Sequence, residues 1–474
     1  MKTLMTLDEA YITALLKENV TAGEIESALE KAARLEGLSH RDTAALLAAT
    51  DTETIDRIFR IAGQIKDHIY GERMVLFAPL YVSDYCVNRC AYCGFNKDNS
   101  RRRYKLTQDE VRAEVAILEK MGHKRLAIEA GEDPANCPLD YVLECIDTIY
   151  NMKFENGEIR RVNVNIAALD TEDYKHLSAA QIGTYILFQE TYHRESYAHY
   201  HLSGPKRDYD YHITAFDRAM EAGIDDVGAG VLFGLYDYKY EVLALMLHNE
   251  HLESRFGVGF HTISVPRIRD TGHGCTYPYA VNDEDFLKLV AILRIAVPFT
   301  GMIVSTREHP DMRRKLTRVG ISQMSAGSST SVGGYSQSES VAAGKQSGGS
   351  EPGIRSKPTE GQFSLADHRD ANEIFYWLME EGILPSFCTA CYRQGRSGDR
   401  FMELAKSGDI KNICLPNGLL TLKEYALDYG DERFKALAGM LIEEKLSGMK
   451  NEKVYGLVKE KLAQLEQGKR DLFI

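Results

Sequence analysis

Three closely spaced cysteines are the part of this chain that points most directly to chemistry. Cys86, Cys90 and Cys93 stand in the run YCVNRCAYCGF, so their C-x3-C-x2-C spacing offers three thiolates with no fourth cysteine nearby. A cubic [4Fe–4S] cluster normally takes four thiolates, and a cluster held by three would keep one iron open to a small molecule. A zinc knuckle completed by a remote ligand is the alternative, because structural zinc needs four closed ligands.

A second group of cysteines lies in the last quarter of the chain. Cys388, Cys391 and Cys414 have the spacing C-x2-C-x22-C. This again provides three thiolates and favours a second iron–sulfur cluster with an open iron, although a zinc site with a distant histidine would fit the spacing too. Four basic residues follow Cys391 and would offset the negative charge of a thiolate cluster, although a solvated basic face would show the same pattern: Arg393, Arg396, Arg400 and Lys411.

The composition is that of an ordinary globular protein. The chain has 474 residues and a formal net charge of -12, and no basic patch dominates, which argues against a nucleic-acid partner. No apolar run is long enough to cross a bilayer, and residues 1–20 form an amphipathic helical pattern rather than a signal peptide. We therefore expect a cytoplasmic protein without membrane partners, whose cysteines are metal ligands or reduced thiols.

Alternating strand and helix patterns in residues 71–330 would position the first cysteine group. Apolar, β-rich runs recur there, and helical patterns separate most of them. Eight strands in about 250 residues have the size and rhythm of an α/β fold of the (β/α)8 TIM-barrel type, although periodicity alone also allows an open barrel or a doubly wound sheet. The predicted strands are 74–82, 125–130, 162–167, 184–189, 226–233, 259–265, 302–307 and 320–326.

Three further regions surround this predicted barrel. Residues 1–70 carry apolar side chains at helical spacing and predict an N-terminal helical extension. Residues 331–362 are rich in Gly and Ser and predict a long loop. Residues 363–474 predict a mostly helical C-terminal region that contains the second cysteine group.

Polar residues stand where several predicted strands end. Barrel enzymes carry their active sites at the carboxyl ends of the strands, so these residues should face the same mouth as the first cysteine loop. Gly131 and Glu132 follow the second strand in the run AGEDP, which would also make a plain turn. Asn165 on the third strand, and Gln189 and Glu190 at the end of the fourth, need either a ligand or an internal hydrogen bond.

Several segments resemble radical S-adenosylmethionine (SAM) enzymes of the ThiH/HydG branch, which are tyrosine lyases. They are the loop CVNRCAYCGFNKDN and the runs FQETYH (188–193), STREHPDMRR (305–314) and QFSLADHR (362–369). The second cysteine group and the run HTISVPRIR (261–269) resemble the HydG type, which matures [FeFe]-hydrogenase. The ThiH type lacks that second cluster. The resemblance covers most of the chain.

The resemblance implies a two-stage reaction. At the first [4Fe–4S] cluster, SAM would give a 5′-deoxyadenosyl radical that takes hydrogen from the amino group of L-tyrosine. Cleavage of the Cα–Cβ bond would yield p-cresol and dehydroglycine. At the second [4Fe–4S] cluster, dehydroglycine would become carbon monoxide and cyanide, which bind an extra iron and leave as an Fe(CO)2(CN) synthon for the hydrogenase. The implied partners are a one-electron donor of the ferredoxin or flavodoxin type and other hydrogenase maturation proteins.

The resemblance also implies residue roles. The two cysteine groups would hold the clusters, and His261 would hold the extra iron, although a lone histidine on a strand is more often a core residue. Ser305 and Arg307 would hold the tyrosine carboxylate as catalytic positions, because the arginine fork binds carboxylates in a bidentate way. Gln189 and Glu190 would also contact substrate. The remaining SAM contacts would come from Tyr92, Gly131, Glu132, Asn165 and Glu190.

Two alternatives stay open. One is a ThiH-type lyase that supplies dehydroglycine for thiazole synthesis, and the other is a non-catalytic iron–sulfur carrier. The segment 270–279, with Cys275, and the Ser/Gly loop after Gly333 depart from the family pattern. We expect both departures to affect how product reaches the second cluster rather than the chemistry.

Overall fold

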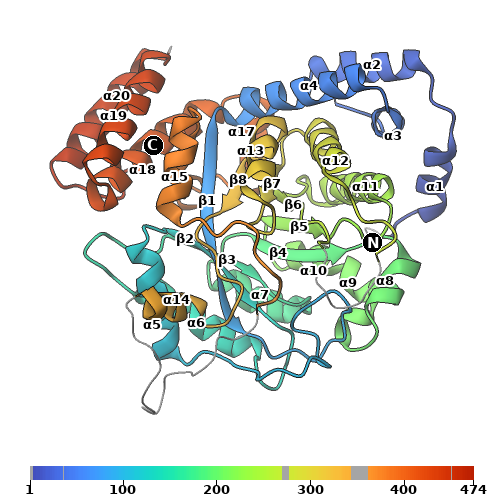
Figure 1. Cartoon of the computed structure of the whole chain (residues 1–474), viewed down its shortest axis with the longest axis horizontal. Helices are drawn as coiled ribbons and strands as arrows, with labels where there is room; N and C mark the ends of the chain where they lie inside the picture. Colours follow the sequence, from blue (N-terminus) through green and yellow to red (C-terminus); the bar gives the residue numbers. More distant parts are fainter. Residues whose placement is uncertain (1–3, 36, 270–276, 343–360, 450) are drawn as a thin grey trace.

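Eight parallel strands close into a barrel that helices surround (Figure 1). The computed structural model describes residues 4–35, 37–269, 277–342, 361–449 and 451–474. Neighbouring strands follow the order β2-β3-β4-β5-β6-β7-β8-β1, and pairing of β1 with β2 closes the ring. The predicted (β/α)8 TIM-type fold is confirmed. Of the departing segment 270–279, residues 270–276 with Cys275 lie outside the described residues.

Each of the eight predicted strands is present, because strands covered on both faces consist of nearly continuous apolar residues. The register of β1 also shows where a ninth strand lies. Val75 pairs with Gln323 of β8 on one edge and with Ser386 of β9 on the other. The strands are β1 (Arg73–Ser83), β2 (Arg125–Ala130), β3 (Arg161–Asn165), β4 (Tyr185–Glu190), β5 (Val227–Val231), β6 (Thr262–Ser264), β7 (Gly301–Val304), β8 (Gln323–Ser325) and β9 (Leu384–Ser386).

Helices fall before, within and after the barrel. The first four are α1 (Glu9–Lys17), α2 (Ala22–Ala33), α3 (His40–Ala48) and α4 (Thr52–Tyr70). The barrel segment contains α5 (Gln108–Lys120), α6 (Leu139–Asn151), α7 (Thr171–Ala179), α8 (Arg194–Tyr200), the 3-10 turn η1 (Pro205–Arg207), α9 (Tyr209–Ile213), α10 (Ala215–Glu221), α11 (Tyr238–Phe256), α12 (Asp283–Ala296) and α13 (Pro310–Val319), and α14 (Gly334–Ala342) follows it. The remaining helices are α15 (Ala371–Glu380), α16 (Ala390–Arg393), α17 (Gly398–Lys406), α18 (Lys411–Tyr429), α19 (Glu432–Ser447) and α20 (Glu452–Glu466).

Helix α14 lies within the segment that the sequence predicts to be a loop. Its Gly- and Ser-rich composition is unfavourable for a helix, but its first turn has two tertiary contacts. The backbone N–H of Tyr335 donates to the Glu114 carboxylate of α5 over 3.1 Å, and the Tyr335 hydroxyl donates to the Pro79 carbonyl over 2.7 Å. An acid at a helix N-terminus satisfies free backbone donors there. Residues 343–360 of the same segment lie outside the described residues.

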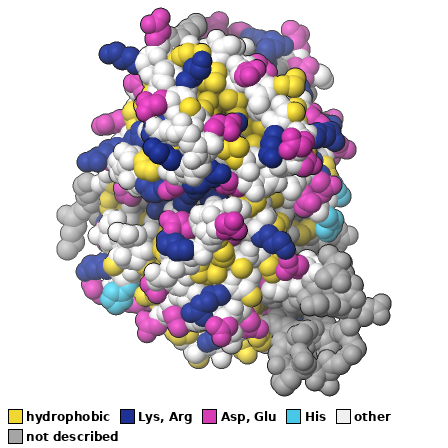
Figure 2. All heavy atoms as spheres, turned by 90° about the vertical axis from the view of Figure 1, so that its left-hand side faces the viewer, with side chains coloured by type: hydrophobic (Ala, Val, Ile, Leu, Met, Phe, Trp, Pro, Cys, Tyr) yellow, Lys and Arg dark blue, Asp and Glu magenta, His cyan; other side chains and the backbone are white. Residues whose placement is uncertain are grey.

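The C-terminal helices α18, α19 and α20 pack beside the barrel on the left of Figure 1. On that face acidic and basic side chains are interspersed, with apolar atoms in small groups between them (Figure 2). None of the described helices is both long enough and apolar enough to span a membrane. The division of the chain into an extension, a barrel, a loop and a C-terminal region stays a prediction.

Candidate active site

A cavity of about 210 Å³ lies at the carboxyl ends of the barrel strands. Cys86, Cys90 and Cys93 line it from the loop that follows β1. Burial and the neighbouring Cys86 raise the pKa of Cys93 to about 11, and burial raises the pKa of Cys90 as well. We call this cavity the mouth site.

The mouth site suits a cluster better than a single metal ion. Among the described residues, no three His, Cys, Asp or Glu side chains converge as ligands of one ion would. The thiolates of a cubic cluster bind different irons, so they stand farther apart around it. Three thiols around one cavity therefore fit an iron–sulfur cluster, whose binding would displace their protons.

Buried polar contacts hold the cysteine loop in place. The Asp84 carboxylate accepts hydrogen bonds from the Arg101 guanidinium over 3.0 Å and from the Tyr104 backbone. Arg103 donates to the Asp84 and Phe95 carbonyls over 2.8 and 2.9 Å. Because these partners lie within one loop, the sequence positions the three cysteines locally.

The run AGEDP packs directly on that loop. A Cβ atom at Gly131 would lie 2.4 Å from the Tyr85 carbonyl oxygen and 3.1 Å from the Cys86 Cβ, so only glycine allows this approach. The Glu132 carboxylate accepts a hydrogen bond from the Asn88 amide, and the Glu132 carbonyl accepts one from the Val87 N–H over 2.8 Å. Burial raises the pKa of the Glu132 carboxyl. The segment is thus part of the mouth site.

Two further predicted SAM contacts, Tyr92 and Asn165, line the mouth site. The Tyr92 hydroxyl lies 2.7 Å from Nε2 of His201. The Asn165 amide donates to the Glu129 carboxylate over 2.6 Å. Internal partners therefore satisfy part of the hydrogen-bonding capacity of both residues.

Strand β4 brings one of its two predicted contacts to the mouth site. Glu190 lines the cavity, and Nζ of Lys206 lies 2.8 Å from its carboxylate. The Glu190 backbone has φ +69°, a conformation that costs free energy outside glycine and is common at functional sites. Gln189, the residue before Glu190, does not line this cavity.

Ser305 and Arg307 lie in the mouth site after β7. The Arg307 guanidinium lies 3.9 Å from the centre of the Phe363 ring, and its buried Nε has no hydrogen-bond partner among the described residues. A buried donor without a partner needs an acceptor. The carboxylate of a bound ligand would supply one.

Sequence reasoning missed Glu129 and Lys206, which both line the mouth site. Glu129 stands near the end of a predicted strand, directly before AGEDP. An acidic residue at that position could have indicated a site residue. Lys206 comes from the turn η1 and gave no such signal. Although burial opposes its charge, Glu190 and Cys90 raise the pKa of Lys206.

The second cysteine group lies at the opposite end of the barrel. Cys388, Cys391 and Cys414 line a cavity of about 50 Å³ beside the starts of β1, β2 and β7. Burial raises the pKa of Cys391 to about 12, and the thiols of Cys414 and Cys388 add to this effect. Arg73, at the start of β1, is half-buried here, and although desolvation opposes its charge, the three thiols raise its pKa. We call this cavity the floor site.

His261 also lines the floor site, immediately before β6. Its Nε2 lies 3.3 Å from the Tyr392 hydroxyl, and its Nδ1 lies 3.9 Å from the Asp226 carboxylate. Burial lowers the pKa of His261, so the neutral imidazole that a metal requires is favoured. The fold therefore brings His261 and the second cysteine group to one cavity.

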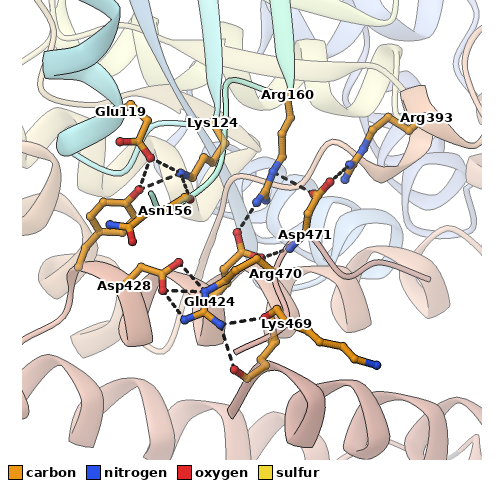
Figure 3. Close-up of polar contacts among 12 residues, drawn as sticks. Glu119, Lys124, Asn156, Arg160, Arg393, Glu424, Asp428, Lys469, Arg470 and Asp471 are labelled. Atoms are coloured by element: carbon orange, nitrogen blue, oxygen red, sulfur yellow. Dashed lines mark hydrogen bonds and ion pairs between the residues drawn. The ribbon is translucent and has the colours of Figure 1, made fainter. Parts of the chain in front are cut away.

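Ion pairs attach helix α18, which carries Cys414, to the barrel floor (Figure 3). Nζ of Lys124 lies 2.7 Å from the Glu119 carboxylate and 2.8 Å from the Tyr429 hydroxyl. Arg160 pairs with Glu424 of α18, and both side chains are buried. The position of Cys414 therefore depends on contacts between residues far apart in the sequence.

Comparisons with known proteins agree with this geometry. The model of the Radical SAM superfamily matches residues 80–248, and that of the Biotin and Thiamin Synthesis associated domain matches residues 264–384. A 2-iminoacetate synthase from Salmonella typhimurium is 29% identical over 366 residues, which cover 77% of this chain and 90% of that protein.

Two solved structures match nearly the whole chain. A crystal structure of HydG, a maturase of the [FeFe]-hydrogenase, has a TM-score of 0.92 and 52% sequence identity, and the match covers 98% of this chain and 99% of that chain. HydG from Carboxydothermus hydrogenoformans has a TM-score of 0.80 and 35% sequence identity, and the match covers 96% of this chain and 100% of that chain. With this identity over almost its full length, the chain belongs to the HydG family of radical SAM enzymes.

Proposed function

We propose that this chain cleaves the Cα–Cβ bond of L-tyrosine to p-cresol and dehydroglycine. It then converts dehydroglycine to carbon monoxide and cyanide, which leave as an Fe(CO)2(CN) unit for [FeFe]-hydrogenase assembly. The observation that carries this proposal is one barrel with three cysteines at each end. Two separate three-thiolate sites suit two successive reactions.

At the mouth site, a bound cluster and SAM would supply the 5′-deoxyadenosyl radical. Cys86, Cys90 and Cys93 would hold the cluster, and the close approach at Gly131 places the AGEDP run beside it. Tyr92, Glu132, Asn165 and Glu190 would orient SAM. The apolar part of the lining excludes water from the reacting atoms.

Ser305 and Arg307 are proposed to hold the tyrosine carboxylate. The unpartnered Nε of Arg307 is a donor for which the described residues offer no acceptor. Its guanidinium lies over the Phe363 ring, a contact that restricts where the side chain can move. Gln189 is not supported as a substrate contact, since it lies outside the mouth site.

At the floor site, Cys388, Cys391 and Cys414 would hold a second [4Fe–4S] cluster, and His261 would hold an extra iron. Arg73 and Arg396 would offset the negative charge of the thiolates, because both interact electrostatically with these cysteines. The proposal further requires a one-electron donor of the ferredoxin or flavodoxin type and hydrogenase maturation proteins as partners.

The match to a 2-iminoacetate synthase favours one second candidate. 2-Iminoacetate is dehydroglycine, so a lyase that stops after the first stage would be supported by the mouth site alone. Such an enzyme would leave the floor cysteines without a catalytic task.

The test is carbon monoxide release, detected with deoxyhaemoglobin, from anaerobically reconstituted protein given SAM, L-tyrosine and dithionite. We expect carbon monoxide in proportion to tyrosine consumed, and we expect Cys391→Ala to lose it while still forming p-cresol. Cys145→Ala is the control, because it also removes a thiol, while Cys145 lies buried on α6 outside both cavities. Formation of p-cresol without carbon monoxide in the parent protein would favour the second candidate.

A further inference from the structure

Glu129 is a carboxyl group in the mouth site that the proposed roles above do not use. It is the last residue but one of β2, directly before Ala130, and it lines the cavity. Its Oε2 accepts the hydrogen bond from Asn165 over 2.6 Å, and the structure gives it no cationic partner within the described residues. An acid of this kind has room to bind a cationic group of a ligand.

The other two acids that line the described part of the cavity, Glu190 and Glu132, already interact with side chains of the protein. Glu190 pairs with Lys206 over 2.8 Å, and Glu132 holds Asn88 of the cysteine loop within the electrostatic influence of Lys206. Among the described residues, Glu129 has no such cation beside it. It therefore differs from both in that no basic group of the described chain stabilises its ionised form, so the ammonium group of a ligand would do so.

Glu129 and Arg307 both line the mouth site. Tyr81 of β1 lines it as well, and its hydroxyl donates to the Gln362 side chain over 2.9 Å. One unpaired acid and one guanidinium with a free donor complement the two charged groups of an α-amino acid. Arg307 would take the carboxylate, which leaves the ammonium group to Glu129.

We propose that Glu129 binds the ammonium group of the amino-acid substrate and accepts one proton from it. The N–H bond breaks, an O–H bond forms on the Glu129 carboxylate, and no electrons are exchanged. The substrate is left as a neutral amine with N–H bonds available to the radical. This inference rests on the proposed amino-acid lyase function.

The acidity of Glu129 is suited to such a transfer. Burial raises the pKa of its carboxyl to about 8. The ammonium group of a free amino acid is a weaker acid than the α-amino group of a peptide, whose pKa is about 7.7–8.0, so an acceptor with a raised pKa makes the transfer less unfavourable. A group with a pKa near the working pH is also available in both protonation states, as a general base requires.

The test compares two ligands in Glu129→Gln. The glutamine keeps the shape of the side chain and an oxygen for Asn165, but it has no charge and accepts no proton. Binding to the anaerobic protein with SAM is measured by equilibrium dialysis, with L-tyrosine and with 3-(4-hydroxyphenyl)propionate, which lacks the amino group. We expect tyrosine affinity to fall about tenfold to a hundredfold, with unchanged affinity for the analogue and unchanged SAM binding. Glu129→Asp should restore part of the tyrosine affinity.

Glu241→Gln is the matched control, because burial also raises the pKa of Glu241 to about 8 and it lies on α11 outside the cavity. Equal losses for both ligands, or p-cresol formation by Glu129→Gln at the parental rate, would overturn the assignment. A parent protein that neither binds tyrosine nor forms p-cresol would instead overturn the proposed function, and this inference with it.

Discussion

The mouth and the floor of the barrel each hold three cysteines, but the chain assembles the two groups differently. At the mouth, one loop carries all three thiols and is held by its own residues, such as Asp84 and Arg101. At the floor, Cys388 follows β9 and Cys414 comes from α18, which the barrel holds through Arg160 and Glu424. The mouth site is thus local in sequence, while the floor site exists only when distant segments dock.

The charges of the two sites differ as well. The mouth site contains three acids and the cations Lys206 and Arg307. The floor site contains Arg73 and Arg396 close to the thiols. Groups of both signs suit the zwitterionic ligands proposed for the mouth, and an excess of arginine suits an anionic cluster at the floor.

The largest expected effect is confined to the mouth. Cys86→Ala removes one of three cluster ligands. We expect 5′-deoxyadenosine formation to fall more than about 100-fold, because mutation even of residues that only support a metal ligand lowers metal affinity or activity about 10–100-fold. Iron content should fall by about four per chain, because the floor cluster stays. Iron analysis and product assay check this. Loss of all iron would show that the two sites are not independent.

The next prediction tests whether the floor cluster depends on the docking of α18 against the barrel, with its cysteine ligands left intact. Glu424→Ala leaves the buried Arg160 without one of its two carboxylate partners, and removing one member of a buried pair costs about 3–5 kcal/mol. We expect denaturant to release floor iron before mouth iron in this variant. Release of both clusters at one denaturant concentration would contradict the difference drawn above.

A smaller effect tests the arginine at the floor. Arg73→Met keeps most of the side-chain volume but removes a charge that the three thiols stabilise. We expect floor iron to be lost to a chelator at a concentration about tenfold to a hundredfold lower. The formation of p-cresol, which belongs to the mouth, should be unchanged, and its loss would argue against separate sites.

A related effect tests the close approach at the mouth. Gly131→Ala forces a Cβ to within 2.4 Å of the Tyr85 carbonyl oxygen, and overpacking of this kind costs about 1–3 kcal/mol. We expect weaker SAM binding by dialysis and an unchanged floor cluster. Unchanged SAM affinity would mean that the cysteine loop moves freely, against the contacts that hold it.

The smallest effect is a control for both sites. Glu380 pairs with Arg433 on the surface over 3.3 Å, and exposed pairs contribute about 0–1 kcal/mol. Glu380→Ala should therefore leave the iron content, both products and the midpoint of unfolding almost unchanged. A loss of floor iron would show that helix α19 also supports that site.

Sequence patterns predicted the barrel well but failed for short or docked elements. The eight strands consist of long apolar runs, since parallel strands are buried on both faces. Strand β9 has only three residues and includes Pro385, which a strand at an outer edge tolerates. Helix α14 is stabilised by the contacts of Tyr335 with Glu114 and Pro79, and no pattern in the local sequence predicts these contacts.

The sequence by itself determined the mouth cysteines, because their spacing and the bonds that hold them lie within one loop. Its strand pattern, together with the family resemblance, also predicted a barrel and thus that Ser305, Arg307 and Glu190 end near one mouth. Only the tertiary structure decided that Cys388, Cys391 and Cys414 meet His261 at the floor, and that Gln189 does not line the mouth site. It also decided the acidity of Glu129, since its burial and the lack of a nearby cation among the described residues depend on residues from other strands.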